Sequence, residues 1–367
     1  MKAFRVAVAG LGLISTEWLR SLGARDDVDV VALVDPNTAG AEAQRTAFGL
    51  SCPVLADLAT AITREQADLV VNLTPPALHR AVTEVAVSGG CNVIVEKPLA
   101  AELADAVAVV LAARSAGKTV AVMQNRRYHP AVRRMRDDVA AGRIGTLVDV
   151  SVDMFLWHRY PNTFLTKIDS PLLRDMAIHQ FDAARAISGA DARTVQALEW
   201  SSPTSWMSGA AGATAAFELA NGAIFSYRGS WVAEGASTSY DGAWRVGGTH
   251  GTLIWDGAEH LRLETVQRPD GPYEPGVTQQ VDDIVSPGDM SGHAKGLAAI
   301  LDALQAGNTP ETVAHDNLLS LAMVEAAVRS SRESQTVKIA AVLADAGWEV
   351  ASREPTSEAI AQTTTSC

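Results

Sequence analysis

Several features that define other protein classes are scarce or missing in this chain. It has 3 cysteines among 367 residues, at positions 52, 91 and 367, and no Cys-x-x-Cys pair. An odd number of widely spaced cysteines excludes a disulfide framework or a thiolate zinc site and indicates a reducing compartment. With 28 Gly and 15 Pro, the chain is too poor in these residues to be disordered or fibrous. No apolar stretch of about 18 residues is present, so we expect no membrane-spanning helix.

Basic residues are also fewer than acidic residues. The chain carries 30 Lys and Arg against 42 Asp and Glu, a net charge of −12, which argues against a nucleic-acid surface. The first apolar run ends in glycines and no small-residue cleavage site follows it, so we expect no secretory signal and a cytoplasmic location. At about 150 residues per domain, this length corresponds to two or three domains.

The first third of the chain alternates between short apolar runs and stretches of helical length. Continuous apolar strands with helical connections indicate a parallel sheet covered on both faces, here an α/β Rossmann domain over residues 1–123. The expected strands are Phe4–Ala9, Val28–Val34, Asp68–Leu73, Cys91–Val95 and Thr119–Met123. The expected helices are Leu13–Ala24, Ala41–Phe48, Ala77–Ser88 and Glu102–Ala116.

The pattern changes after residue 123 to longer strands of alternating polarity, several separated by Asn-Gly or Asp-Gly turns. This pattern predicts an α+β domain over residues 124–340 with a large, mostly antiparallel open sheet. Its expected strands are Leu147–Leu156, Thr194–Trp200, Thr214–Leu219, Ala223–Trp231, Trp244–Gly247 and Thr252–Trp255. Its expected helices are His129–Ala140, Ala294–Gln305 and Asn317–Arg332, and we expect the tail at 353–367 to be disordered.

A glycine-rich turn follows the first strand and opens the first helix. Gly10 suits the tight turn, Gly12 lets the backbone approach a pyrophosphate, and the small Ser15 stands at the position of the usual third glycine. Asp35 ends the second strand, where a carboxylate accepts hydrogen bonds from a ribose diol and repels a 2′-phosphate, so NAD is favoured over NADP. The alternative is a tight turn that binds nothing. The predicted cofactor contacts here are Gly10, Gly12, Leu13, Ile14 and Asp35.

Three polar clusters follow the ends of three strands of the predicted parallel sheet. They begin at Asn72, Glu96 and Gln124, and ligands of open α/β sheets bind at this edge. Each cluster alone could be ordinary turn chemistry, because Pro and Asn are common in turns. Together they predict one site, with further cofactor contacts from Asn72, Thr74, Pro75, His79, Glu96, Lys97 and Asn125.

These motifs resemble the Gfo/Idh/MocA family of NAD(P)-dependent oxidoreductases, which includes glucose–fructose oxidoreductase and inositol dehydrogenase. The resemblance extends from the glycine turn through Thr74–His79 and Glu96-Lys97-Pro98 to Ser170–His179. It implies Lys97, Asp175 and His179 as the catalytic residues and a cis bond between Lys97 and Pro98. The sequence departs from the family at residues 170–173, where Ser-Pro-Leu-Leu replaces a glycine-rich turn.

The spacing of Asp175, His179 and Asp182 supports the catalytic assignment. At i, i+4 and i+7 they share one face of a predicted helix that is otherwise apolar, although a solvated polar face is the alternative. Oxidation of a secondary alcohol needs a base for the hydroxyl proton, and an imidazole such as His179 suits that task. Lys97 would stabilise the developing alkoxide, and Asp175 would orient His179 or share the proton relay.

Substrate contacts are expected from three side chains besides the catalytic ones. Trp157 and His158 leave the first strand of the second domain and suit a sugar ring, although aromatics there more often belong to a core or interface. Arg126 follows a strand end of the first sheet and either contacts substrate or pairs with Asp175 or Glu96. The predicted substrate set is therefore Lys97, Arg126, Trp157, His158, Asp175 and His179.

The leading hypothesis is an NAD-dependent dehydrogenase acting on a sugar, inositol or glycoside. Alternatives are a glycosidase that uses bound NAD for transient oxidation and a non-catalytic sugar- or nucleotide-sensing regulator, which would not need Lys97, Asp175 and His179 together. An open sheet exposes an apolar face unless another subunit covers it, so we expect a homodimer or homotetramer. We expect no metal, because the 8 histidines show no ligand spacing.

Overall fold

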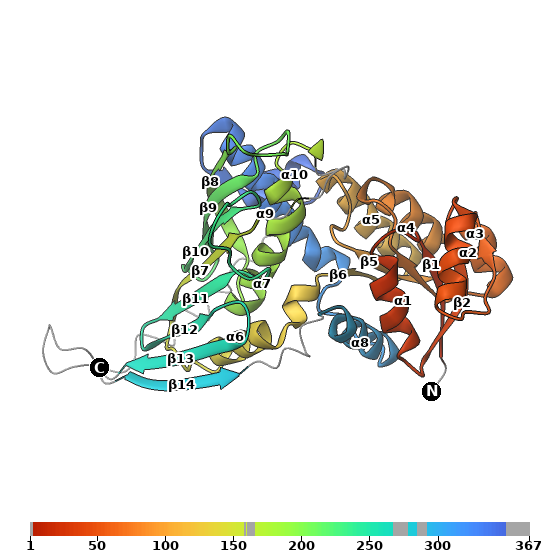
Figure 1. The fold of residues 1–367 in the computed structure, drawn as a ribbon, viewed down its shortest axis with the longest axis horizontal. Helices are drawn as coiled ribbons and strands as arrows, with labels where there is room; N and C mark the ends of the chain where they lie inside the picture. The colour runs from red at the N-terminus through yellow and green to blue at the C-terminus, as the bar shows by residue number, and fades with distance from the viewer. Residues whose placement is uncertain (1–2, 158, 160–165, 267–277, 285–291, 350–367) are drawn as a thin grey trace, which may run out of the picture.

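The computed structural model describes residues 3–157, 159, 166–266, 278–284 and 292–349, which form two sheets with their helices (Figure 1). The first sheet has six strands in the order β3-β2-β1-β4-β5-β6, and the second has nine in the order β14-β13-β12-β11-β7-β10-β9-β8-β15. The expected fold class is confirmed. The substrate contact assigned to His158 and the disorder expected over 353–367 lie outside the described residues.

Every strand of the first sheet runs parallel to its neighbours, as expected for apolar strands joined by helical crossovers. The short strand β3 and helix α3 occupy a connection for which the sequence pattern predicted no element. The strands are β1 (Phe4–Ala9), β2 (Val28–Val34), β3 (Val54–Leu55), β4 (Leu69–Asn72), β5 (Asn92–Glu96) and β6 (Val120–Met123). The helices are α1 (Ser15–Gly23), α2 (Thr38–Ala47), α3 (Leu58–Glu65), η1 (Pro76–Leu78), α4 (His79–Ser88), α5 (Leu103–Ala116) and η2 (Asn125–Tyr128).

One face of the first sheet is covered by helices from both halves of the chain. Trp18 and Leu19 of α1 pack with Leu297 and Ile300 of α8 (Gly292–Gln305) in one apolar cluster with β1. Helices α3, α4 and α5 cover the opposite face. Figure 1 shows α8 beside α1, far from the second sheet. Helix α8 was predicted within the 124–340 domain, but its packing belongs to the first sheet.

The second sheet is mixed and mostly antiparallel. Only the pair β7–β10 is parallel among the described strands, and register partners such as Tyr227 and Val152 define that pair. Strands β13, β14 and β15 add to those expected from the sequence. The strands are β7 (Leu147–Phe155), β8 (Ala192–Trp200), β9 (Gly212–Leu219), β10 (Ile224–Ser230), β11 (Ala243–Gly248), β12 (Gly251–Trp255), β13 (His260–Val266), β14 (Thr278–Ile284) and β15 (Val337–Lys338).

The inner face of the second sheet packs on helices, and its outer face is exposed. Phe181 of α7 makes edge-on ring contacts with Phe217, Phe225 and Tyr227 from the sheet. Figure 1 shows α7 and α9 on the side of the sheet that faces the first domain. The helices here are α6 (Pro130–Ala140), a π-helix at Leu172–Ala177, α7 (Ile178–Ser188), α9 (Ala314–Glu333) and α10 (Ile339–Asp345).

No helix within the described parts of the chain combines the length and the apolar character that crossing a membrane requires.

Candidate active site

The glycine turn lies against the end of strand β4. Gly10 has a φ of +92°, and a Cβ there would stand 2.7 Å from the carbonyl carbon of Leu73, so only glycine fits. A Cβ at Gly12 would meet nothing within 4 Å, which leaves this backbone open to a ligand. Ser15 is fully buried and donates a hydrogen bond to the Gly12 carbonyl at 2.6 Å, so this small residue allows close helix packing.

Backbone amides hold the carboxylate of Asp35 at the same edge. Its two oxygens accept hydrogen bonds from the backbone N–H groups of Leu11, at 2.8 Å, and Asn37, at 2.7 Å. Leu13 of the glycine turn is 97% exposed. An exposed leucine next to open glycine backbone is a surface that a planar ligand can cover.

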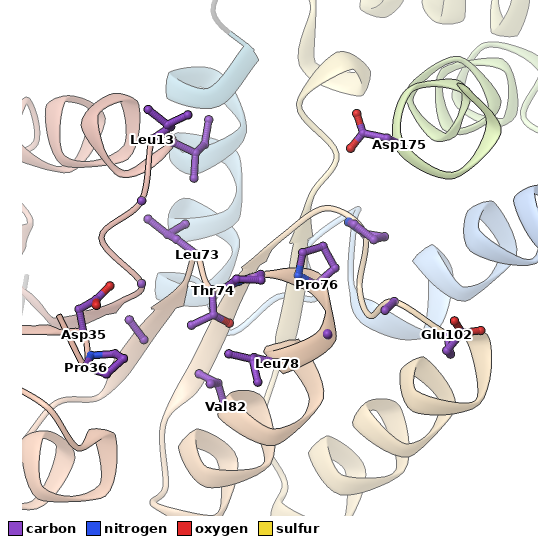
Figure 2. Close-up of a pocket in the computed structure, with 18 of the residues that line it drawn as sticks. Leu13, Asp35, Pro36, Leu73, Thr74, Pro76, Leu78, Val82, Glu102 and Asp175 are labelled. Atoms are coloured by element: carbon purple, nitrogen blue, oxygen red, sulfur yellow. The ribbon is translucent and has the colours of Figure 1, made fainter. Parts of the chain in front are cut away.

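A cavity of about 1370 Å³ runs from this turn to the second domain. Figure 2 shows Asp35 at one end and Asp175 at the other, with Leu73, Thr74 and Pro76 between them. Among the predicted cofactor contacts, the cavity is lined by Gly10, Gly12, Leu13, Ile14, Asp35, Thr74 and Pro75. Charged lining residues that the sequence reasoning missed are Asp57, Glu102, Lys167, Asp169, Arg174 and Arg332.

Two predicted cofactor contacts, Asn72 and His79, lie beneath the cavity wall and support it. Asn72 accepts a hydrogen bond from the Thr74 hydroxyl at 2.6 Å and donates to the carbonyl of His79 at 3.1 Å. The His79 ring nitrogens face the carbonyl oxygens of Thr74, at 2.7 Å, and Pro98, at 2.8 Å. Burial lowers the pKa of His79, and the two carbonyl contacts oppose that shift. His79 thereby ties two strand-end loops together.

Lys97 and Asp175 meet where the two domains face each other. The Lys97 Nζ lies 3.1 Å from Asp175 Oδ1 and donates to the Asp175 backbone carbonyl at 2.9 Å. Each side chain is 19% exposed, and Asp175 lines the cavity, whereas Lys97 and His179 are not among its lining residues. The Lys97-Pro98 bond is cis, as the resemblance implied.

His179 is buried close to this pair but is not bonded to Asp175. Its side chain is 6% exposed, and its Nδ1 has no hydrogen-bond partner among the described residues. Burial lowers its pKa well below the ordinary value, and the charges of Lys97, Arg126 and His293 add to that shift. His179 is therefore neutral at pH 7, as a proton acceptor must be.

The predicted α-helical face through Asp175, His179 and Asp182 is interrupted. Residues 172–177 form a π-helix, and the α-helix begins only at Ile178. A π turn changes the residue spacing per turn, a common feature at functional sites. Asp182 instead forms a buried pair with Arg127, at 2.6 and 2.9 Å, and accepts a hydrogen bond from the Ser320 hydroxyl at 2.7 Å.

Arg126 and Trp157, which were predicted to contact substrate, have partners outside the Lys97–Asp175 pair. Arg126 pairs with neither Asp175 nor Glu96 but with Asp241, and its guanidinium lies 5.0 Å from the ring centre of Tyr240. Trp157 is 40% exposed and forms an isolated bridge with Val232. Tyr240 and Asp241 were missed because their loop carries no recognisable motif, only ordinary turn residues.

Glu96 is buried among donors and does not line the cavity. Its Oε1 accepts hydrogen bonds from Trp18 Nε1 at 2.8 Å and His293 Nε2 at 3.0 Å, and its Oε2 accepts the Lys97 backbone N–H at 2.9 Å. Burial raises the pKa of Glu96, but the bonds and charges of His293, with those of Trp18 and Lys97, outweigh it and hold this pKa below its ordinary value. Asn125, 9% exposed, also lies outside the cavity lining, with its amide 3.3 Å from His293 Nδ1.

Metal ligands do not gather in this site: in the described parts of the chain, no three His, Cys, Asp or Glu side chains cluster as an ion would need.

Two family models match the chain along most of its length. One, described as an oxidoreductase family with an NAD-binding Rossmann fold, matches residues 4–124. The other, described as the C-terminal alpha/beta domain of the oxidoreductase family, matches residues 136–339.

Named relatives are similar to the chain over nearly its full length. A D-apiose dehydrogenase from Paraburkholderia graminis is 29% identical over 364 residues, covering 94% of this chain and 92% of the relative. An inositol 2-dehydrogenase from Rhizobium meliloti is 24% identical over 349 residues, covering 92% and 99%. Among solved structures, an oxidoreductase from Agrobacterium radiobacter in complex with NAD⁺, L-tartaric acid and magnesium has a TM-score of 0.84 at 23% identity, covering 93% of this chain and 100% of that one.

Proposed function

Because the chain belongs to the Gfo/Idh/MocA oxidoreductase family, with an NAD-binding Rossmann domain, we propose that it is an NAD-dependent dehydrogenase. Its substrate is a secondary alcohol of a sugar, inositol or glycoside. The observation that carries this proposal is the Lys97–Asp175 pair at the end of the cavity that begins at Asp35.

The cavity suits a dinucleotide along its length. The glycine turn presents open backbone before the N-terminus of α1, where a pyrophosphate is stabilised. Asp35 has its oxygens fixed by two backbone amides and faces the cavity, where it would accept hydrogen bonds from a ribose diol. NAD is preferred to NADP because a 2′-phosphate would meet the charge of Asp35. When bound, the nicotinamide supplies the acceptor for hydride.

Lys97, Asp175 and His179 divide the work of removing the hydroxyl proton. Lys97 donates a hydrogen bond to the reacting oxygen and stabilises negative charge as the proton leaves. Asp175 fixes the Lys97 ammonium at 3.1 Å and carries the balancing charge. His179, neutral because burial lowers its pKa, accepts the proton on its imidazole ring. In reduction the same proton returns to the carbonyl oxygen.

A polyhydroxylated substrate suits the side chains on the second-domain side. Lys167, Arg174 and Asp175 line the cavity there and offer donors and acceptors. Arg126 and Asp241 pair with each other and are not among the lining residues. Relatives named for D-apiose and inositol act on compounds of this kind.

We also infer that two copies associate through the outer face of the second sheet. Leu198, Trp200 and Ile224 on this face are 59%, 42% and 43% exposed, which is unusual for large apolar side chains. Arg228 and Asp153 form an ion pair on the same face, so the contact would combine apolar and charged groups. Light scattering of the purified protein tests this, and a monomer would contradict it.

The test of function is the absorbance of reduced nicotinamide after the protein is mixed with NAD or NADP and a panel of inositols, aldoses and glycosides. Absorbance with one class of polyol supports the proposal and identifies the substrate type. Release of free sugar from a glycoside without net NADH would show a glycosidase instead. Dinucleotide binding without either product would favour a sensor.

A further inference from the structure

The start of helix α8 lies unusually close to the turn that follows strand β6. A Cβ at Gly292 would stand 2.2 Å from the carbonyl oxygen of Asn125, and a Cβ at Gly296 would stand 2.8 Å from the Met123 sulfur. Glycine at position 292 therefore allows the two backbones to approach, and glycine one helical turn later leaves room for the Met123 side chain. This approach delivers His293, from the second half of the chain, to the end of strand β5.

His293 donates one of the hydrogen bonds that the buried Glu96 carboxylate accepts. Glu96 is 8% exposed, and His293 Nε2 must be a donor in their 3.0 Å contact because a carboxylate only accepts. The other oxygen of Glu96 accepts the backbone N–H of Lys97. Trp18 donates to the same oxygen as His293, and its ring meets the imidazole edge-on at 6.1 Å between centres.

We propose that His293 is a positioning residue for Lys97, acting through Glu96. The Nε2–H of His293 holds the Glu96 carboxylate in the orientation that fixes the Lys97 backbone, and so sets where the Lys97 ammonium lies. This inference rests on the proposed function, in which Lys97 contacts the reacting oxygen.

Without the His293 donor, Glu96 keeps its burial but loses one of three hydrogen bonds. A lost bond to a buried charge corresponds to about a 10- to 100-fold effect. The carboxylate then turns toward a remaining donor, and the Lys97 ammonium moves relative to Asp175. We expect the loss in kcat, with NADH affinity changed by less than about threefold, because neither Glu96 nor His293 lines the cavity.

The experiment compares two variants, His293→Gln and His293→Asn, whose side-chain amides differ only in length. In His293→Gln the amide nitrogen extends to the place of Nε2 and can donate to Glu96, whereas in His293→Asn it extends only to the place of Nδ1. We expect kcat of the Gln variant within about threefold of wild type and kcat of the Asn variant about 10- to 100-fold lower. His315→Asn, at an exposed histidine of α9, is the matched control and should leave kcat unchanged.

A second readout does not depend on turnover. In protein labelled with ¹⁵N-tryptophan, the Trp18 indole N–H signal, identified by its loss in Trp18→Phe, reports the Glu96 carboxylate directly. We expect this signal to move in His293→Asn and to stay close to its wild-type position in His293→Gln and His315→Asn.

The outcomes separate this inference from the proposed function. Equal kcat in the Gln and Asn variants, or an unmoved Trp18 signal in the Asn variant, overturns the role of His293 and leaves the dehydrogenase proposal intact. If Lys97→Ala retains full turnover, the proposed function itself fails, whatever the His293 variants do. A low kcat in the Asn variant, restored in the Gln variant and accompanied by the Trp18 shift, supports the inference.

Discussion

Asp175 and Asp182 stand seven residues apart, and each pairs with a cation from the first domain or the turn that follows it. The Lys97–Asp175 pair has both side chains 19% exposed and lies at a cavity. The Arg127–Asp182 pair has side chains 9% and 1% exposed, and Asp182 also bonds to Ser320. The first pair retains donors and acceptors for a substrate, and the second is saturated. This difference supports the proposal that the Lys97–Asp175 pair takes part in catalysis, whereas the Arg127–Asp182 pair anchors α7.

Removing the ammonium or the imidazole of the reachable site should have the largest effect. For Lys97→Ala and His179→Ala we expect turnover to fall by about 10²- to 10⁴-fold, since each removes a group that handles the proton. NADH binding, measured by fluorescence titration, should remain near wild type. Full turnover in either variant would contradict the role assigned to that residue.

Breaking the saturated pair should reduce stability. Asp182→Asn removes one of two carboxylates that pair with buried Arg127, because Asp316 Oδ2 also lies 3.2 Å from its guanidinium. The loss of charged hydrogen bonds should lower the free energy of unfolding by about 1.5–3 kcal/mol. Asp345→Asn is the control, because its 2.7 Å pair with Arg329 is 67% exposed on the Asp side and should contribute little to stability. Urea unfolding of both variants measures the difference. Similar values for the two would show that Asp182 does not anchor α7.

A variant of Asp35 tests cofactor preference at the other end of the same cavity. Asp35→Ala removes the charge that would meet a 2′-phosphate, so the ratio of kcat/KM for NAD over NADP should fall by about tenfold. Steady-state kinetics with both cofactors gives this ratio. An unchanged ratio would mean that another residue distinguishes the two cofactors.

The smallest effect is expected in the pH profile. The proposed alcohol oxidation needs neutral His179, and the pKa of His179 is held well below 6.5, first by burial and then by neighbouring charges. Lowering the pH from 8 to 6.5 should therefore leave kcat/KM at saturating NAD nearly constant, and the acid limb should appear only well below 6.5. A limb centred at 6.5 or higher would show that His179 is not the base or is not desolvated.

The sequence predicted the first-domain part of the site better than the rest. Gly10, Gly12 and Asp35 belong to one continuous pattern of strand, turn and helix, so their geometry follows from local rules. Tyr240 and Asp241 reach Arg126 only through the pairing of distant strands, and no local pattern indicates that contact.

The π-helix at residues 172–177 shows a second limit. The spacing of Asp175 and His179 correctly suggested a helix, but propensity does not reveal one whose turns are wider than an α-helix. Asp182 was placed on the same face as Asp175 by α-helical periodicity alone. Its actual partner, Arg127, lies 55 residues earlier, where only the tertiary fold brings it close.

The return of α8 to the first sheet has a consequence for biosynthesis. Trp18 and Leu19 share their apolar cluster with Leu297 and Ile300, which the ribosome adds about 280 residues later. During translation, the nascent Rossmann half therefore has part of one sheet face bare until α8 has been synthesised. A fragment ending at residue 123 would keep that face exposed permanently, so it should bind chaperones and aggregate where the whole chain does not.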